Sequence, residues 1–196
     1  MSATTALTEG FADPVHDGQA VFRAVLDAMA HPGRVVGLPA RLRPPAPLHG
    51  AAMAVCLTLL DFETPLWLDA AAARAADDLR FHCGCPIVDA PGDAAFALIA
   101  DPEWMPPLEA FDPGLAAYPD RSATLIVQVE FLLPGVGVRL RGPGIEGAAA
   151  LNAAPLPDGF WEQARRNHRL YPRGVDVILT APRALVALPR STAVEA

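Results

Sequence analysis

The stretch Thr124-Leu-Ile-Val-Gln-Val-Glu130 decides the fold class, because it is the firmest strand signal in the sequence. It is a short apolar run with β-branched residues, and such a run predicts a β-strand. Similar short runs predict strands at 34–38, 65–68, 96–99, 136–141, 175–180 and 184–188. The last two runs flank Ala181-Pro182-Arg183, and this order predicts a hairpin near the end of the chain.

Helical periodicity surrounds these strands. Four apolar residues at the i, i+3, i+4, i+7 spacing predict one buried stripe on a helix that begins after Asp17: Phe22, Val25, Leu26 and Met29. His31-Pro32-Gly33 ends this helix, and we expect His31 to cap it or face its dipole rather than act as a base. Further helices are predicted at 49–60, 70–79 and 160–167, with a short helical turn around Trp104.

Helices and strands alternate early in the chain, and hairpins dominate later. This order predicts an α/β fold of three layers, in which a mixed β-sheet is flanked by helices. The chain has 196 residues, and we expect one domain over 16–196, preceded by a flexible segment over 1–15.

The composition excludes several classes of function. The formal net charge is −7, so the electrostatic footprint of a surface that binds DNA or RNA is missing. All 15 residues counted as Lys+Arg are arginines. The absence of lysine excludes a Schiff base with pyridoxal phosphate, a phosphate-binding loop lysine and a kinase-type strand lysine. Any phosphate would therefore be bound by arginine guanidiniums or backbone N–H groups.

The sequence also predicts a compartment. Met1 to Gly10 has neither the basic flank nor the apolar region of a secretory signal. The stretch 44–60 is the longest without Asp, Glu or Arg, and it is too short and too rich in proline to span a membrane. Three cysteines without a disulfide framework are typical of a reducing cytoplasm. We therefore expect a cytoplasmic protein that binds no membrane.

Two motifs resemble known binding sites, one for a metal ion and one for a dinucleotide. His82-Cys83-Gly84-Cys85 offers soft metal ligands, but no second ligand pair accompanies it, which favours small buried thiols. The segment 142–147 (GPGIEG) matches the dinucleotide fingerprint G-x-G-x-x-G. Prolines within and after it favour a structural turn at the exit of a strand. No serine stands in a nucleophile elbow and no H-E-x-x-H occurs. We therefore assign no catalytic, cofactor-binding or metal-ligating residue.

Six groups of residues carry a resemblance, in this order along the chain: Phe22-Arg23 with Leu26 and Ala28 to Gly33; Leu57 to Asp61 with Thr64-Pro65 and Trp67; Leu79-Arg80-Phe81-His82; Tyr118-Pro119-Asp120 with Ala123 to Ile126 and Gln128-Val129; Gly142-Pro143-Gly144-Ile145; and Tyr171-Pro172, Gly174-Val175-Asp176, Leu179 and Leu188 to Thr192. Together they resemble the PhnH family, the H subunit of the bacterial carbon–phosphorus lyase system. The sequence departs from the family pattern at Cys83, Tyr171 and Ser191.

The resemblance implies a fold similar to the large domain of pyridoxal-phosphate-dependent transferases, without the cofactor. It also implies a homodimer in isolation and a complex with subunits G, I and J. That complex forms α-D-ribose 1-alkylphosphonate 5-triphosphate from ATP and a phosphonate. The chain is then expected to be an accessory, non-catalytic subunit of phosphonate catabolism that needs no cofactor.

Two hypotheses remain open from the sequence. A scaffold would contact its partners through apolar and arginine side chains, for which the candidates are Trp104, Met105, Phe111, Tyr118 and the helical segment Arg165 to Arg169. Alternatively, the chain is a nucleotide- or phosphonate-binding enzyme subunit with an arginine-lined pocket, for which the candidates are Arg23, Arg80, His82 and Arg121. A stand-alone dinucleotide oxidoreductase would depend on Gly142 and Gly144 and is disfavoured.

Overall fold

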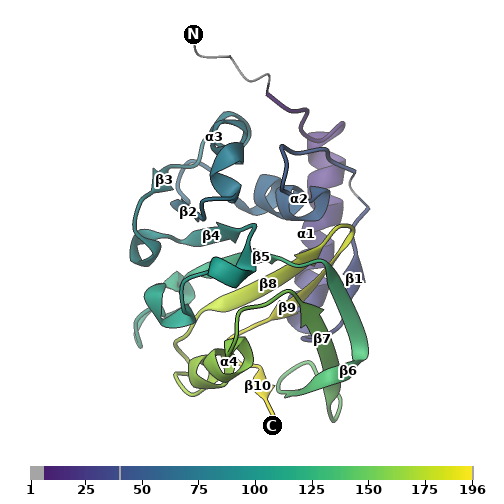
Figure 1. The fold of residues 1–196 in the computed structure, drawn as a ribbon, viewed down its shortest axis with the longest axis vertical. Helices are drawn as coiled ribbons and strands as arrows, with labels where there is room; N and C mark the ends of the chain where they lie inside the picture. The colour runs from purple at the N-terminus through teal and green to yellow at the C-terminus, as the bar shows by residue number, and fades with distance from the viewer. Residues whose placement is uncertain (1–6, 40, 196) are drawn as a thin grey trace.

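A seven-stranded mixed sheet lies at the centre of the computed structural model, which describes residues 7–39 and 41–195 (Figure 1). The strand order is β1-β9-β8-β5-β4-β2-β3. The strands of this sheet are β1 (Val36–Gly37), β2 (Leu66–Leu68), β3 (Ile87–Val88), β4 (Phe96–Ile99), β5 (Thr124–Gln128), β8 (Asp176–Ala181) and β9 (Ala184–Leu188). Strands β3, β2, β4, β5 and β8 are parallel neighbours, whereas β9 is antiparallel to both β8 and β1. The predicted α/β class, mixed sheet and terminal hairpin are confirmed.

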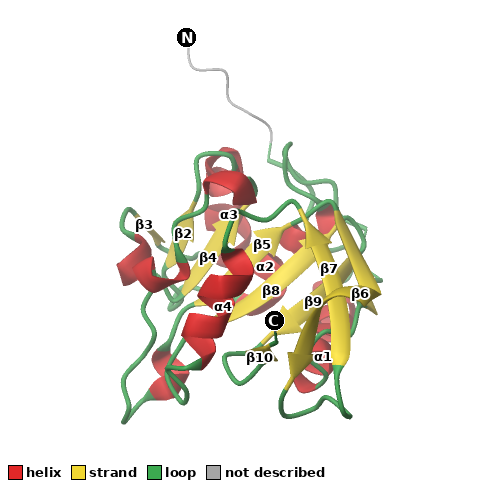
Figure 2. Ribbon diagram, turned by 60° about the horizontal axis from the view of Figure 1, so that its bottom comes forward, coloured by secondary structure: helices red, strands yellow, loops and turns green. Residues whose placement is uncertain are grey.

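The α-helices of the described residues are α1 (Pro14–Ala30), α2 (Gly50–Leu59), α3 (Ala76–Cys83) and α4 (Phe160–His168). Side chains alternate across the central strands, so the sheet has an apolar cluster on each face. Ile126 of β5 packs with α1, α2 and α3, while its neighbours Leu125 and Val127 pack with Phe160 of α4 on the other face. Figure 2 shows α4 in front of the sheet and α1 and α2 behind it.

A second, three-stranded antiparallel sheet covers part of the α4 face. It has the order β10-β6-β7 and consists of β6 (Phe131–Arg141), β7 (Ala149–Ala154) and β10 (Ala193–Val194). Leu140 of β6 and Leu151 of β7 are fully buried in the apolar cluster of this face. The sequence predicts the second half of β6 at 136–141 but contains no signal that we interpreted as β7 or as a second sheet.

The buried face of α1 differs from the prediction. The buried side chains are those of Val21, Ala24, Val25 and Ala28. Phe22 and Leu26, which the periodicity assigned to the core, are 49% and 57% exposed. Small side chains allow the helix to lie close to β9 and α2, and the larger ones remain on the outer face.

The ends of α1 correct one prediction and confirm another. The helix begins at Pro14 and not after Asp17, because Asp13 accepts hydrogen bonds from the N–H groups of Val15 and His16. His31 is the C-cap residue, and its N–H donates to the Asp27 carbonyl as predicted for a capping role. Of the segment 1–15, residues 1–6 lie outside the described residues.

The remaining helix predictions hold apart from one shift. Helices α2 and α4 agree with the predicted 49–60 and 160–167, and Pro102–Trp104 forms the expected short turn. The helix predicted at 70–79 is wrong in its bounds, because Ala72–Ala75 is a 3-10 turn and α3 follows over Ala76–Cys83. No helix in the described parts of the chain is long and apolar enough to cross a membrane.

Candidate functional site

The four residues proposed for an arginine-lined pocket come from three separate elements. Arg23 is exposed on α1, and Arg80 and His82 lie on α3. Arg80 forms an exposed ion pair with Asp77, and Nε2 of His82 is 2.9 Å from the Thr8 carbonyl oxygen. The Arg121 guanidinium stacks over the Tyr118 ring at 4.5 Å. None of the four lines the two largest cavities, so the structure does not assemble this predicted site.

The most buried ion pair of the described residues joins three of the motif segments. Arg190 and Asp176 have side chains that are 17% and 10% exposed, and their Nη2 and Oδ2 atoms are 2.6 Å apart. The Arg190 backbone N–H also donates to Asp176 at 2.7 Å, and its Nη1 donates to the Pro119 carbonyl. These contacts fix the loop after β9 against the start of β8. The pair is therefore a structural clamp between distant parts of the chain.

The glycine motif is also structural. The segment 142–147 connects β6 to β7, with Gly144 at φ +81° packed against the α1 C-terminus. A Cβ at this position would overlap the Ala30 carbonyl oxygen, so only glycine fits. The next element is a strand and not the helix that a dinucleotide fingerprint requires. The predicted structural turn at the strand exit is confirmed.

The three cysteines are free, and the Cys83 thiol lies 3.8 Å from the Cys56 carbonyl oxygen. Burial raises the pKa of Cys56. A hydrogen bond between the Cys83 and Cys85 thiols raises the pKa of Cys83 and lowers that of Cys85. Within residues 7–39 and 41–195, no group of three His, Cys, Asp or Glu side chains is placed to hold a metal ion.

The carboxyl ends of the parallel strands are the usual ligand site of an α/β sheet, so their polar residues matter. Asp69, which follows β2, accepts hydrogen bonds from the N–H groups of Ala72, Ala100 and Asp101 at 2.6–2.9 Å. Its carboxylate therefore joins the ends of β2 and β4 and turns the chain into the 3-10 segment. It acts as an internal cap, with its oxygens already occupied.

Gln128 closes the same edge at the end of β5. Its Oε1 accepts from the His49 N–H at 2.6 Å, and its Nε2 donates to the Pro47 carbonyl at 2.9 Å. The residue thus holds the start of α2 over the sheet. Burial lowers the pKa of His49, opposed by the charge of Glu130. The chain's own loops fill the edge where a ligand would be expected.

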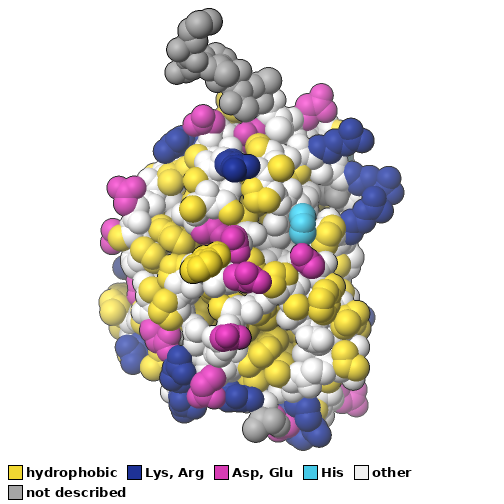
Figure 3. Space-filling view, in the orientation of Figure 1, with side chains coloured by type: hydrophobic (Ala, Val, Ile, Leu, Met, Phe, Trp, Pro, Cys, Tyr) yellow, Lys and Arg dark blue, Asp and Glu magenta, His cyan; other side chains and the backbone are white. Residues whose placement is uncertain are grey.

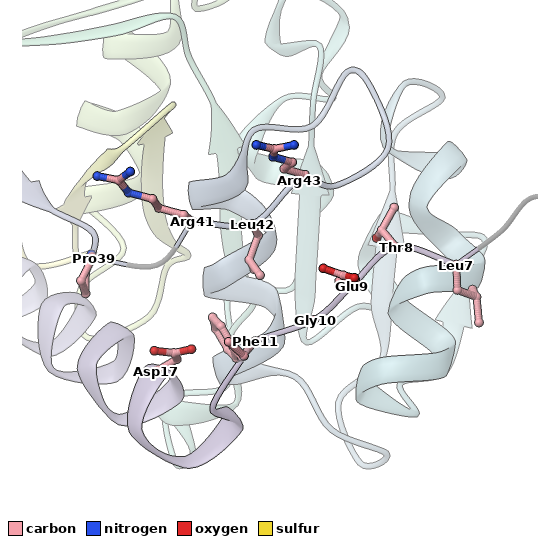
Figure 4. Close-up of a pocket in the computed structure, with 11 residues that line it drawn as sticks. Leu7, Thr8, Glu9, Gly10, Phe11, Asp17, Pro39, Arg41, Leu42 and Arg43 are labelled. Carbon is pink, nitrogen blue, oxygen red and sulfur yellow. The ribbon is translucent and has the colours of Figure 1, made fainter.

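The largest cavities lie elsewhere, on either side of the segment that connects β1 to α2. One of about 870 Å³ is formed by this segment and residues 7–12, and Figure 4 shows Phe11 and Leu42 directed toward it. The second, of about 600 Å³, is lined by Arg41, Arg43 and Arg183. In Figure 3, basic side chains gather at the upper right edge, over this connection and the β8–β9 turn. Neither the spacing nor the composition of the sequence indicated this grouping.

The exposed apolar side chains correct the list of contact candidates. Trp104 is 84% exposed and Tyr118 50%, whereas Met105 and Phe111 are 8% and 1% exposed and belong to the core. The α4 arginines are largely used within the chain: Arg165 donates to the backbone carbonyls of Val194 and Glu195, and Arg166 pairs with Glu109. The sequence missed the outer face of α1, where Val15, Phe22 and Leu26 are 49–75% exposed.

Comparison with known proteins extends over nearly the whole chain. The family model described as "Bacterial phosphonate metabolism protein (PhnH)" matches residues 9–195. The chain is 39% identical to the alpha-D-ribose 1-methylphosphonate 5-triphosphate synthase subunit PhnH of Rhizobium meliloti, over 100% of this chain and 99% of that protein. It is 33% identical to the putative C-P lyase subunit protein HtxG of Stutzerimonas stutzeri, over 89% of this chain and 84% of that protein.

Proposed function

Because the chain belongs to the PhnH family of bacterial phosphonate metabolism proteins, we propose that it is an accessory, non-catalytic subunit of a carbon–phosphorus lyase assembly. Both relatives are named as subunits, one of alpha-D-ribose 1-methylphosphonate 5-triphosphate synthase and one of a C-P lyase. Its role is to support, through contacts with other subunits, the formation of the ribose phosphonate triphosphate in phosphonate catabolism.

The observation that carries this proposal is the apolar outer face of α1. Phe22 and Leu26 belong to the residues that carry the family resemblance, yet they are about half exposed. Fully burying a large apolar side chain contributes roughly 1.5–3 kcal/mol, so a partner that covers the exposed half of Phe22 or Leu26 contributes about half of that for each. Val15, 75% exposed, lies two turns earlier on the same helix and extends the face.

The partners follow from the family resemblance. We propose that the outer face of α1 contacts one of the subunits G, I and J, that the isolated chain is a homodimer, and that it acts in the cytoplasm. We also propose that 16–196 is one domain with a fold similar to the large domain of pyridoxal-phosphate-dependent transferases. In support of this fold, β9 alone is antiparallel to the other six strands of the large sheet. The chain has no lysine to bind that cofactor covalently.

The test is co-purification of the tagged chain with subunits G, I and J expressed together. We expect the wild-type chain to recover the other three and the double variant Phe22→Glu/Leu26→Glu to recover much less. Phe62→Glu is the matched control, because Phe62 is 73% exposed and lies in the turn between α2 and β2. Light scattering of the isolated chain reports the homodimer separately. The proposal is contradicted if subunits G, I and J form a stable complex with one another but do not co-purify with the wild-type chain.

A further inference from the structure

The connection between β1 and α2 is held in place by the chain around it. The Leu38 N–H donates to the Arg183 carbonyl at 2.9 Å, which ties the start of the connection to the β8–β9 turn. A Cβ at Gly50 would lie 2.6 Å from the Leu42 carbonyl oxygen, so the first residue of α2 packs directly against the connection. Arg41, Arg43 and Arg183 are therefore brought to one cavity by backbone contacts.

The charges around this cavity are not balanced internally. Eight of the arginines form ion pairs with carboxylates: Arg34, Arg80, Arg139, Arg141, Arg165, Arg166, Arg169 and Arg190. Arg41, Arg43 and Arg183 form none with a carboxylate of the described residues, although the chain has 22 Asp and Glu. Among the residues that the structure describes, no carboxylate lines the cavity of about 600 Å³ that these three arginines share. Three guanidiniums around one hollow in an acidic protein attract an anion.

The larger cavity, of about 870 Å³, differs in its lining. It shares Arg41 and Arg43 with the cavity of about 600 Å³ but adds Glu9 and Asp17, together with the apolar side chains of Phe11 and Leu42. In Figure 4 the Leu42 side chain extends to the opposite side of the connection from the two guanidiniums. The cavity of about 600 Å³ thus suits an anionic group, and the larger cavity adds Phe11 and Leu42 as an apolar contact beside its charged residues. The volume of each lies within the range of small-molecule sites.

We propose that the arginine cavity binds a phosphate or phosphonate oxyanion carried by a nucleotide-sized organic molecule. Arg41, Arg43 and Arg183 donate hydrogen bonds to the tetrahedral oxyanion, for which the planar guanidinium is well matched. The organic part of the ligand lies over Leu42 and Phe11. This inference goes beyond the accessory role, because it gives the chain a ligand of its own.

Calorimetric titration of the full chain at low salt tests the inference with three ligands: ATP, inorganic triphosphate and methylphosphonate. We expect saturable binding with a Kd below about 1 mM for at least one of them. If ATP and triphosphate bind with equal affinity, the ligand is recognised through its polyphosphate. If ATP binds more tightly than triphosphate, the organic part of the ligand also contributes to binding. If only methylphosphonate binds, the ligand is a phosphonate. Arg183→Ala should weaken binding about tenfold, and Arg41→Ala/Arg43→Ala should abolish it.

Arg74→Ala is the matched control, because Arg74 is exposed on the 3-10 segment after β2 and forms no ion pair within the described residues. It should leave the Kd unchanged. Absence of saturable binding, equal losses in Arg74→Ala and Arg183→Ala, or binding of polyglutamate but of none of the three ligands overturns the inference. Arg41→Ala/Arg43→Ala should still co-purify with the other subunits, so failure of the ligand site is distinguishable from failure of the accessory role.

Discussion

Replacing Arg190 with alanine tests whether the clamp between the motif segments stabilises the fold. The substitution removes the two side-chain donors that reach Asp176 at 2.6 and 3.2 Å, and also the contact with the Pro119 carbonyl. The Asp176 carboxylate, only 10% exposed, then retains the Arg190 backbone N–H as its donor. Breaking a buried ion pair by removing one partner costs about 3–5 kcal/mol.

We expect the lower end of that range, because the Arg190 side chain is still 17% exposed and water can reach part of the site. A loss of about 3 kcal/mol in a chain of this size corresponds to a fall in Tm of roughly 6–12 °C. Urea denaturation followed by tryptophan fluorescence gives the free energy of unfolding, and thermal denaturation followed by circular dichroism gives Tm. Arg190→Ala should shift the urea midpoint without changing the slope.

The control is Arg80→Ala, which removes an exposed ion pair with Asp77 and should change stability by less than about 0.5 kcal/mol. A double replacement, Asp176→Leu with Arg190→Met, should recover much of the loss, because no buried charge remains unpaired. If Arg190→Ala costs no more than Arg80→Ala, the clamp contributes nothing and the reasoning is refuted.

Three further results are expected. Gly144→Ala should destabilise the fold by more than about 2 kcal/mol in urea denaturation, because its Cβ overlaps the Ala30 carbonyl, whereas Gly147→Ala, at φ +70° in open space, should cost only about 1–2 kcal/mol. Burial lowers the pKa of His49, so as the pH falls the unfolded chain binds a proton at this histidine at a higher pH than the folded chain does. The free energy of unfolding therefore falls as the pH drops below about 6.5. The His49→Gln variant should lose less stability than the wild type between about pH 8 and 5.5. Iodoacetamide at neutral pH should modify the native thiols slowly and all three rapidly in urea, because the pKa values of Cys56 and Cys83 are raised and Cys85, whose pKa is lowered, is buried.

The central strands could be predicted because their signal is local. Strands β5 and β8 are short apolar runs, and both proved to be buried along nearly their whole length. Strand β7 has the sequence Ala-Ala-Leu-Asn-Ala-Ala, which carries no β-branched residue. It is a strand because it pairs with β6 across the turn at 142–147, and this tertiary contact overrides the preference of alanine for helices.

The first helix shows why the orientation of an element is harder to predict than its existence. Its spacing admits two adjacent apolar stripes, one with Val21, Ala24 and Ala28 and the other with Phe22 and Leu26. Hydrophobicity favours the larger residues as the core, whereas close packing on the sheet selects the smaller ones. The start of the helix does have a local signal, because Asp13 followed directly by Pro14 is a typical N-terminal pattern of a helix.

The candidate ligand site could not be found from the sequence, because about 140 residues separate Arg43 from Arg183. Only the antiparallel pairing of β1 with β9 places the β8–β9 turn beside the connection to α2. The four residues for which charge alone indicates an anion site, among them Arg23 and Arg121, lie on three separate elements. Charge identifies candidates, whereas the topology decides which of them meet.

The residues that carry the family resemblance form two groups, one inside the molecule and one on its surface, and the two groups differ in what explains them. Gly144 and Arg190 act inside the molecule, where a close backbone contact and an ion pair account for them fully. Phe22 and Leu26 make no comparable contribution to the core, because about half of each side chain faces water. A fold can account for the first group without reference to any other protein. The second group is accounted for by the contact with a neighbouring subunit that we propose for the outer face of α1.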